Sequence, residues 1–267
     1  MKPKLIQFTD RSQIIEFKKQ KFSLTPEEIA NKINIDIETY KSYDNWVIIN
    51  GEWYYYKEIY DERKFVNEML GVKVCEYFDI PSVKYDIGYA LNLQHLGITL
   101  ISKNFRKNDV KYLNQDDVTT SRELITDIND YVEKDRVKEV KLKLLKALIV
   151  NFAISNIDYN RYNILFEVKT SKIFDIAPLF DFENSFKRVI DLYQNDLQTF
   201  RLEDLKEMMD TYPQIKPYIQ KIFDMNLLSL LDDIQEQYHL IIDKEQLKNS
   251  YIDYENKLKS RLSLYLK

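Results

Sequence analysis

The chain has 267 residues, 45% of them hydrophobic, which suits one large domain or two lobes around a cleft. Its 39 basic and 43 acidic side chains give a net charge of -4, a balance that excludes a general attraction to nucleic acid or to a membrane surface. A single cysteine, Cys75, excludes an internal disulfide and is typical of a reducing compartment. We see no signal peptide or membrane span in the sequence, and we therefore expect a soluble cytoplasmic protein.

The first 45 residues are polar and favour helices. Within them, residues 24–42 can be read as a helix-turn-helix, which leaves a DNA-binding regulator as an alternative function. Residues 1–45 carry nearly equal numbers of acidic and basic side chains, whereas a DNA-binding motif usually has a basic face. The simpler interpretation is a helical brace for the sheet that follows.

Strand signals begin around Asn50-Gly51, a dipeptide typical of two-residue hairpin turns. The predicted elements of this part are, in order, the strands Trp46–Ile49 and Glu52–Lys57, the helix Asp61–Phe78, and the strands Val83–Leu93 and Ile98–Ser102. The helix is expected to end before Pro81, since the residue that precedes a proline avoids the helical conformation. Gly97 is the predicted joint between the last two strands.

The second half of the chain is predominantly helical. Its predicted helices are Asp116–Lys134, Val137–Ser155, Leu202–Met209, Ile215–Leu231 and Lys244–Leu266. The strand signals of this half lie at residues 164–168 and 172–177, which are predicted to form a hairpin. We therefore predict an α+β fold with a sheet-rich lobe at residues 1–102 and a helical lobe at residues 103–267.

Three oxygen-bearing side chains flank the predicted hairpin. Asp158 and Asn163 stand five residues apart before its first strand, and Asp181 stands 23 residues beyond Asp158, after its second strand. Because a hairpin returns the chain to its starting level, these residues are expected to meet at one end. The spacing is that of a phosphoryl-transfer site, in which Asp158 orients the attacking hydroxyl while Asn163 and Asp181 hold magnesium. Asp175, in the middle of a strand, is interpreted as a structural hydrogen-bonder, with metal ligation as the alternative.

A lysine and a glutamate in the first half complete this prediction. Lys57 ends an aromatic strand, where it can neutralise phosphates, and the next helix offers Glu68 to hold it in place. Lys41 and Lys64 are rival candidates for the lysine, but only Lys57 ends an aromatic strand. A lysine–glutamate pair opposite a metal-binding aspartate is the arrangement found in kinases.

The motifs together resemble the HipA-like family of serine/threonine kinases. That family's catalytic loop reads roughly Asn-x-Asp-x-His-x-x-Asn, and this chain has Asn156-Ile157-Asp158-Tyr159-Asn160-Arg161-Tyr162-Asn163. The family's metal segment reads roughly Ala-Pro-Leu-Tyr-Asp, which matches Ala177-Pro178-Leu179-Phe180-Asp181 here. Lys57 and Glu68 match the family's lysine and glutamate, and residues 97–103 resemble the strand that leads to its adenine-binding hinge. The likeness covers about residues 40–190 and is nearest to the family's short forms, the CtkA type.

The resemblance implies a two-lobed protein kinase-like fold that uses ATP and Mg²⁺. The implied catalytic residues are Asp158, Lys57 and Glu68, the implied metal ligands are Asn163 and Asp181, and the implied nucleotide-binding residues are Lys57, Ser42, Ile101 and Ser102. The implied partners are a protein substrate and a small antitoxin protein, since some members of the family are toxins of toxin–antitoxin pairs. The sequence does not identify the substrate.

Two departures from the family pattern favour a pseudokinase as the alternative, that is, a nucleotide-binding interaction module without turnover. The family's catalytic-loop histidine is replaced by Asn160. The glycine-containing phosphate loop is replaced by residues 39–44, which hold no glycine, although backbone contacts to phosphate form most easily at glycine. Ser42 lies in this segment, roughly where some family members phosphorylate themselves.

Overall fold

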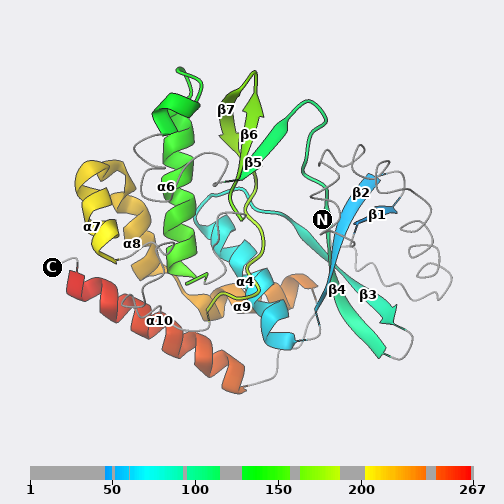
Figure 1. Ribbon diagram of the computed structural model, residues 1–267. Coiled ribbons are helices and arrows are strands. Elements are labelled where there is room, and N and C mark those ends of the chain that lie inside the picture. The colour runs from blue at the N-terminus through cyan, green and yellow to red at the C-terminus, as the bar shows by residue number, and fades with distance from the viewer. Residues whose placement is uncertain are drawn as a thin grey trace. The chain divides into compact units, whose positions relative to one another are not determined.

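The computed structural model describes residues 46–49, 52–59, 61–92, 95–114, 128–156, 163–186, 202–238 and 245–265 (Figure 1). These residues form a mixed α and β fold with a small antiparallel sheet and several helices, as predicted. The chain divides into two compact units, residues 1–65 with 83–112 and residues 66–82 with 113–267. The division into lobes at residue 102 stays a prediction.

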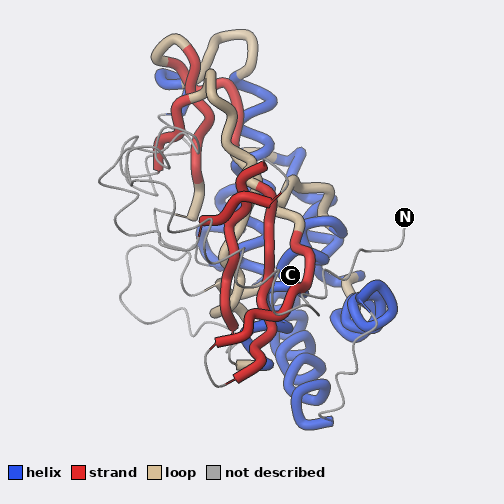
Figure 2. Tube along the Cα trace, turned by 90° about the vertical axis from the view of Figure 1, so that its right-hand side faces the viewer, coloured by secondary structure: helices blue, strands red, loops and turns tan. Residues whose placement is uncertain are grey.

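The first unit contains a four-stranded antiparallel sheet in the order β1-β2-β4-β3, and Figure 2 draws the strands in red. Its strands are β1 (Trp46–Ile49), β2 (Glu52–Ile59), β3 (Tyr85–Asn92) and β4 (His95–Lys103). The prediction of a joint at Gly97 was wrong, because Gly97 lies within β4 and pairs with Ala90 of β3. Cross-strand pairing here outweighs the local tendency of glycine to break a strand.

The second unit is mostly helical and takes in most of α4, the helix that follows β2. Its elements are α4 (Glu62–Tyr77), β5 (Lys111–Asn114), α6 (Val137–Ala153), β6 (Leu165–Lys169), β7 (Lys172–Ile176), α7 (Leu202–Thr211), a 3₁₀ turn (Pro213–Ile215), α8 (Lys216–Asp224), α9 (Leu227–Tyr238) and α10 (Glu245–Tyr265). Two of these elements are shared with the first unit: α4 begins there, and β5 crosses the border between the units. Strands β5, β6 and β7 form a second sheet in that order. The β6–β7 hairpin confirms the prediction, whereas β5 was missed.

Helix α6 is the centre of the second unit's core. Ten of its residues are buried, among them Leu144, Leu148 and Phe152, and a helix that is apolar on most of its surface belongs in an interior. It contacts β7 and α8, and α10 contacts α7 and α9 (Figure 1). Helix α6 thereby fixes the hairpin that precedes Asp181.

Two predicted helices were wrong in their extent. The single helix predicted at 215–231 is two helices, since Met225 has an extended backbone and Asn226 Oδ1 accepts a hydrogen bond of 3.0 Å from Ser229 N–H at the start of α9. The helix predicted to reach Lys134 ends earlier, because Val132 forms a bridge with Ile173. Residues 116–127 of that prediction lie outside the described part.

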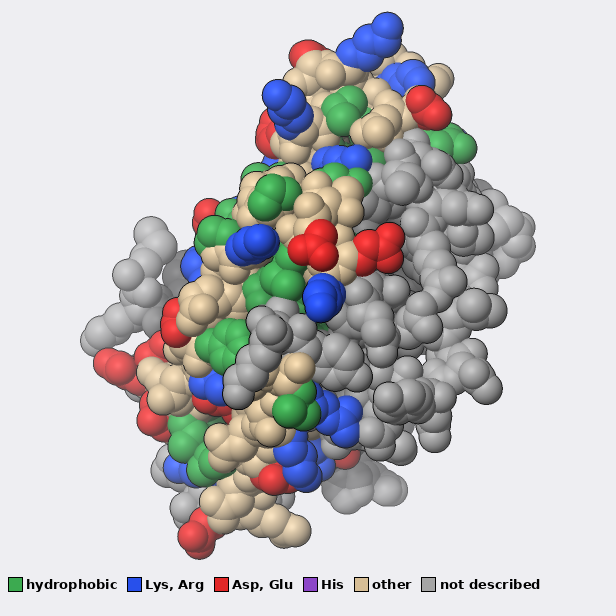
Figure 3. All heavy atoms as spheres, turned by 90° about the vertical axis from the view of Figure 1, so that its left-hand side faces the viewer, with side chains coloured by type: hydrophobic (Ala, Val, Ile, Leu, Met, Phe, Trp, Pro, Cys, Tyr) green, Lys and Arg blue, Asp and Glu red, His purple; other side chains and the backbone are tan. Residues whose placement is uncertain are grey.

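The described surface carries charges of both signs, and the single cysteine lies in the core. On the face that Figure 3 shows, the basic and acidic side chains of the described residues are interspersed. Cys75 is fully buried in α4, and burial raises the pKa of its thiol, so this side chain fills the core as a neutral group. None of the described helices has the length and the apolar character needed to cross a membrane.

Candidate metal and phosphoryl-transfer site

Helix α4 holds the segment 181–186 through its buried face. The Glu68 side chain is fully buried, and its Oε2 accepts a hydrogen bond of 2.9 Å from the backbone N–H of Phe182. One helical turn further on, Gly71 has no side chain, and a Cβ there would lie 2.4 Å from both Cβ and Cγ of Phe182. Phe182, itself 1% exposed, therefore packs directly on the backbone of α4.

Three carboxylates converge where α4 meets this segment. Glu68, Asp181 and Glu183 each offer one oxygen, and these oxygens lie within 4.8 Å of one another. Glu68 is buried and the other two are partly exposed, so one side of the cluster faces solvent. Carboxylate oxygens are the ligands that Mg²⁺ and Mn²⁺ prefer, and the cluster can therefore hold such a cation.

The backbone at Asp181 adopts an unusual conformation that its neighbours maintain. Its φ of 66° lies in the left-handed region, which aspartate tolerates better than most residues do. Its carbonyl accepts a hydrogen bond of 3.3 Å from Nδ2 of the buried Asn156, which also donates to Oδ1 of Asn151 at 3.2 Å. Asn151 belongs to α6, and its Nδ2 donates a hydrogen bond of 3.0 Å to the Ala147 carbonyl of the same helix. The end of α6 thus helps to fix the backbone that presents the Asp181 carboxylate.

The β6–β7 hairpin brings the two predicted metal-binding segments to the same end. Asn163 precedes β6 and is 8% exposed. Ala177 N–H donates a hydrogen bond of 2.9 Å to the Leu165 carbonyl, which extends the hairpin by one pair beyond β7. The chain therefore enters the hairpin after Asn163 and leaves it toward Asp181 at one end, as the predicted hairpin requires.

In the first unit, the register of β2 and β4 places three predicted residues on neighbouring strands. Lys57 lies opposite Leu100, and Tyr55 lies opposite Ser102. Because side chains alternate along a strand, Lys57 and Ser102 point to the same face of the sheet and Ile101 to the other. Ile101 is 1% exposed and Ser102 is 6% exposed, while Lys57 is partly exposed.

Two predicted site residues, Asp158 and Ser42, lie outside the residues that the structure describes. Of the others, the structure brings Glu68 and Asp181 together. Glu183, the third member of this cluster, was missed by sequence reasoning, although an acid two residues after the predicted metal ligand Asp181 was the available signal. Asp175 is confirmed as a structural hydrogen-bonder, since its carboxylate binds Lys143 Nζ at 2.7 Å and accepts from Ile176 N–H at 2.8 Å.

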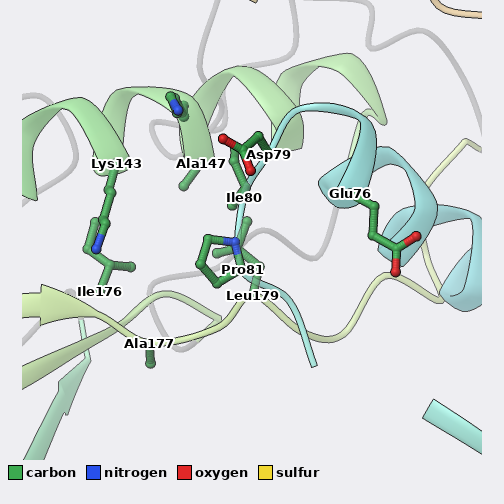
Figure 4. Close-up of a pocket in the computed structure, with 10 residues that line it drawn as sticks. Glu76, Asp79, Ile80, Pro81, Lys143, Ala147, Ile176, Ala177 and Leu179 are labelled. Carbon is green, nitrogen blue, oxygen red and sulfur yellow. The ribbon is translucent and has the colours of Figure 1, made fainter. Parts of the chain in front are cut away.

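A cavity of about 530 Å³ lies in the second unit and is lined in part by the segment that leads to Asp181 (Figure 4). Its lining residues come from the end of α4, from α6 and from the chain around the end of β7: Glu76, Asp79, Ile80, Pro81, Lys143, Lys146, Ala147, Ile176, Ala177 and Leu179. Burial lowers the pKa of Lys143, but bonds to Asp175 and Glu139 outweigh it and raise that pKa overall, so this side chain stays a cation. Leu179 N–H donates to the Pro81 carbonyl at 2.9 Å, which ties the segment to the end of α4.

Comparison with known proteins identifies the fold. No family model and no curated protein matches the chain. The solved structure of the Helicobacter pylori proinflammatory kinase CtkA matches with a TM-score of 0.53 and 15% identity, over 83% of this chain and 90% of that one. The chain has a HipA/CtkA-type kinase fold. HipA of Shewanella oneidensis, solved with HipB and operator DNA, matches with a TM-score of 0.50 and 13% identity, over 83% of this chain and 63% of that one.

The resemblance that the sequence motifs indicated is therefore confirmed for the fold. Sequence identities of 15% and 13% support a shared fold and do not extend to a shared activity, cofactor or partner. Activity, cofactors and partners therefore depend on what the site itself can do.

Proposed function

We propose that this protein is an ATP- and Mg²⁺-dependent kinase that phosphorylates a serine or threonine hydroxyl of another protein. The observation that carries the proposal is the cluster of Glu68, Asp181 and Glu183 at the start of the segment 181–186, within a HipA/CtkA-type kinase fold. In the proposal, the two lobes predicted at residues 1–102 and 103–267 hold ATP between them.

Each predicted residue has a role in this proposal. Asp181 and Asn163 bind the metal, which neutralises the charge that develops on the phosphates. Glu68, whose Oε2 accepts a hydrogen bond from Phe182 N–H, is proposed to hold Lys57 against the phosphates, as the lysine–glutamate pair of kinases does. Asp158 accepts the hydroxyl proton as the hydroxyl oxygen bonds to the γ-phosphorus and ADP leaves.

Nucleotide contacts are assigned to the first unit. Lys57 and Ser102 share one face of the four-stranded sheet and are proposed to meet the nucleotide there. Ile101 faces the opposite side, so its contribution in this proposal is through the backbone at the hinge. Ser42 is proposed as a phosphate-loop residue that works through its side chain, since residues 39–44 hold no glycine.

A pseudokinase is the second candidate function. The glycine-free segment 39–44 and Asn160 in place of the family's histidine favour it. Such a protein keeps nucleotide binding and lacks phosphoryl transfer, so the two candidates differ in one measurable step.

The partner proposed beyond the substrate is a small antitoxin. It is supported by the likeness to a HipA that was solved with HipB and operator DNA. A DNA-binding role for residues 24–42 stays a hypothesis, because those residues lie outside the described part of the chain. The protein is also proposed to act in the cytoplasm.

Transfer of phosphate from ATP tests the proposal. The purified chain with γ-labelled ATP and Mg²⁺ is expected to label itself or a protein in an extract. Asp158→Asn is expected to lower the labelling rate by about 10²–10⁴-fold, the usual contribution of a positioned acid–base group, without weakening nucleotide binding. Nucleotide binding without any labelling by the wild-type protein would instead support the pseudokinase.

A further inference from the structure

One buried amide links the C-terminal helix to the segment that carries the carboxylates. Asn67, next to Glu68 on α4, is fully buried. Its Nδ2 donates to the carbonyls of Glu183 at 3.0 Å and Ser185 at 2.7 Å, and its Oδ1 accepts from the hydroxyl of Tyr251 on α10 at 2.7 Å. The amide therefore joins three elements that are far apart in sequence.

The orientation of this amide is set by its partners. Both N–H bonds of Nδ2 are used by backbone carbonyls, which cannot donate, and the oxygen is used by a phenol that donates. A flipped amide would place its oxygen against two carbonyl oxygens and leave its nitrogen facing Tyr251. Since Tyr251 is itself fully buried, the loss of its hydroxyl would leave Oδ1 of Asn67 without that donor in a dry interior.

The segment that Asn67 holds is bounded by two strained residues. Asp181 has a φ of 66° and Phe186 a φ of 59°, and both conformations persist only where neighbouring contacts maintain them. The ring of Phe186 packs edge-on against Tyr251 with 5.7 Å between centroids. Tyr251 thus touches the far end of the segment through its ring and the middle through Asn67.

We propose that the Tyr251–Asn67 pair is a positioning device through which the C-terminal helix sets the geometry of the carboxylates of Asp181 and Glu183. Asn67 fixes the backbone of Glu183, while the adjacent Glu68 fixes Phe182 and supplies the third carboxylate. The metal-binding part of this inference rests on the proposed function. Asn67 and Tyr251 touch no reacting atom and act through the segment 181–186.

A neighbouring tyrosine provides a matched control. Tyr254 lies one helical turn further along α10, is also buried, and packs edge-on against Phe186 with 5.5 Å between centroids. Its hydroxyl, however, donates to the Ala153 carbonyl at 2.8 Å and is bonded to Ser155 Oγ at 2.9 Å, at the end of α6. Tyr254→Phe removes the same atom as Tyr251→Phe without breaking the link to Asn67.

The test compares Tyr251→Phe with Tyr254→Phe in the full-length chain by two readouts. Mn²⁺ binding, followed by electron paramagnetic resonance, is expected to weaken about tenfold in Tyr251→Phe and to change less than twofold in Tyr254→Phe. Hydrogen exchange at the Phe182 and Ser185 amides is expected to be about tenfold faster in Tyr251→Phe alone, since the segment then opens locally more often. Both variants are expected to lose a similar amount of thermal stability.

The two readouts separate the positioning role from the proposed function. If the wild-type protein binds no Mn²⁺, the metal site fails, and the exchange rates at Phe182 and Ser185 alone decide whether Tyr251 positions the segment. Equal exchange rates in the two variants would overturn the positioning role, and so would a loss of Mn²⁺ affinity that Tyr254→Phe reproduces.

Discussion

Asp181→Asn is expected to weaken binding of a Mg²⁺-bound, non-hydrolysable ATP analogue by about a hundredfold, which corresponds to about 2.7 kcal/mol. The substitution keeps the size of the side chain and its left-handed backbone, since asparagine also tolerates that conformation. It removes the charged oxygen that lies within 4.8 Å of oxygens of Glu68 and Glu183. Calorimetric titration with and without Mg²⁺ measures the effect, and binding in the absence of metal is expected to be unchanged.

Asp175→Asn is the matched control for this experiment. Asp175 is an aspartate of the same unit, but its carboxylate binds Lys143 at 2.7 Å and lies outside the carboxylate cluster. Its replacement is expected to lower stability and to leave the Mg²⁺ dependence of nucleotide binding unchanged. Equal losses in the two variants, or an Asp181→Asn protein that binds the Mg²⁺ complex as the wild type does, would contradict the role of Asp181.

Gly71→Ala is expected to destabilise the protein by about 1–3 kcal/mol, the usual effect of overpacking. The added Cβ would lie 2.4 Å from Cβ and Cγ of Phe182, atoms at the base of a side chain that cannot simply rotate away. The segment 181–186 must therefore move, and Mn²⁺ affinity is expected to fall as well. Urea unfolding and Mn²⁺ titration measure the two effects.

The sign of the stability change in Gly71→Ala distinguishes overpacking against Phe182 from an effect of helix propensity. At an open position in a helix, alanine is more stable than glycine by about 0.5–1 kcal/mol, so a helix-propensity effect alone would raise stability. Glu76→Ala, at an exposed position of the same helix, is the control and is expected to change stability by no more than about 0.5 kcal/mol. A Gly71→Ala protein more stable than the wild type would show that Phe182 does not pack directly on α4.

The features predicted best from sequence are those encoded in short stretches. The β6–β7 hairpin follows from two runs of β-formers around Thr170 and Ser171, both of which have positive φ in the structure. Helix α6 follows from its apolar residues, and the kinase-type fold follows from the motifs around Asp158 and Asp181. Each of these signals depends on residues close together in the chain, where spacing alone carries information.

The features missed depend on contacts between distant segments. Strand β5 pairs with β6 only in the folded sheet, and Gly97 continues a strand because β3 lies alongside it. The break between α8 and α9 is set partly by Asn226 and partly by Glu255 of α10, whose Oε2 accepts from Leu227 N–H at 2.6 Å. Tertiary contacts of this kind override local propensity.

The candidate site likewise contains residues that local motifs predicted and residues whose contacts depend on distant segments. Asp181 and Glu68 were predicted because each belongs to a motif, whereas the bond of Glu68 to Phe182 N–H depends on the contact between α4 and the segment 181–186. Asn67 reads in the sequence as an ordinary helical polar residue, and Tyr251 as one of 20 tyrosines. The hydrogen bond between them joins residues 184 positions apart in the sequence, and no local pattern predicts a contact at that separation.

Anomalous diffraction from crystals grown with Mn²⁺ and a non-hydrolysable ATP analogue tests the central claim most directly. The predicted result is a Mn²⁺ peak at coordination distance, about 2.1 Å, from oxygens of Asp181 and Asn163, with the analogue's phosphates completing the shell. A metal bound elsewhere, or a bound analogue whose phosphates lie away from Asp181, would contradict the assignment of this segment as a phosphoryl-transfer site.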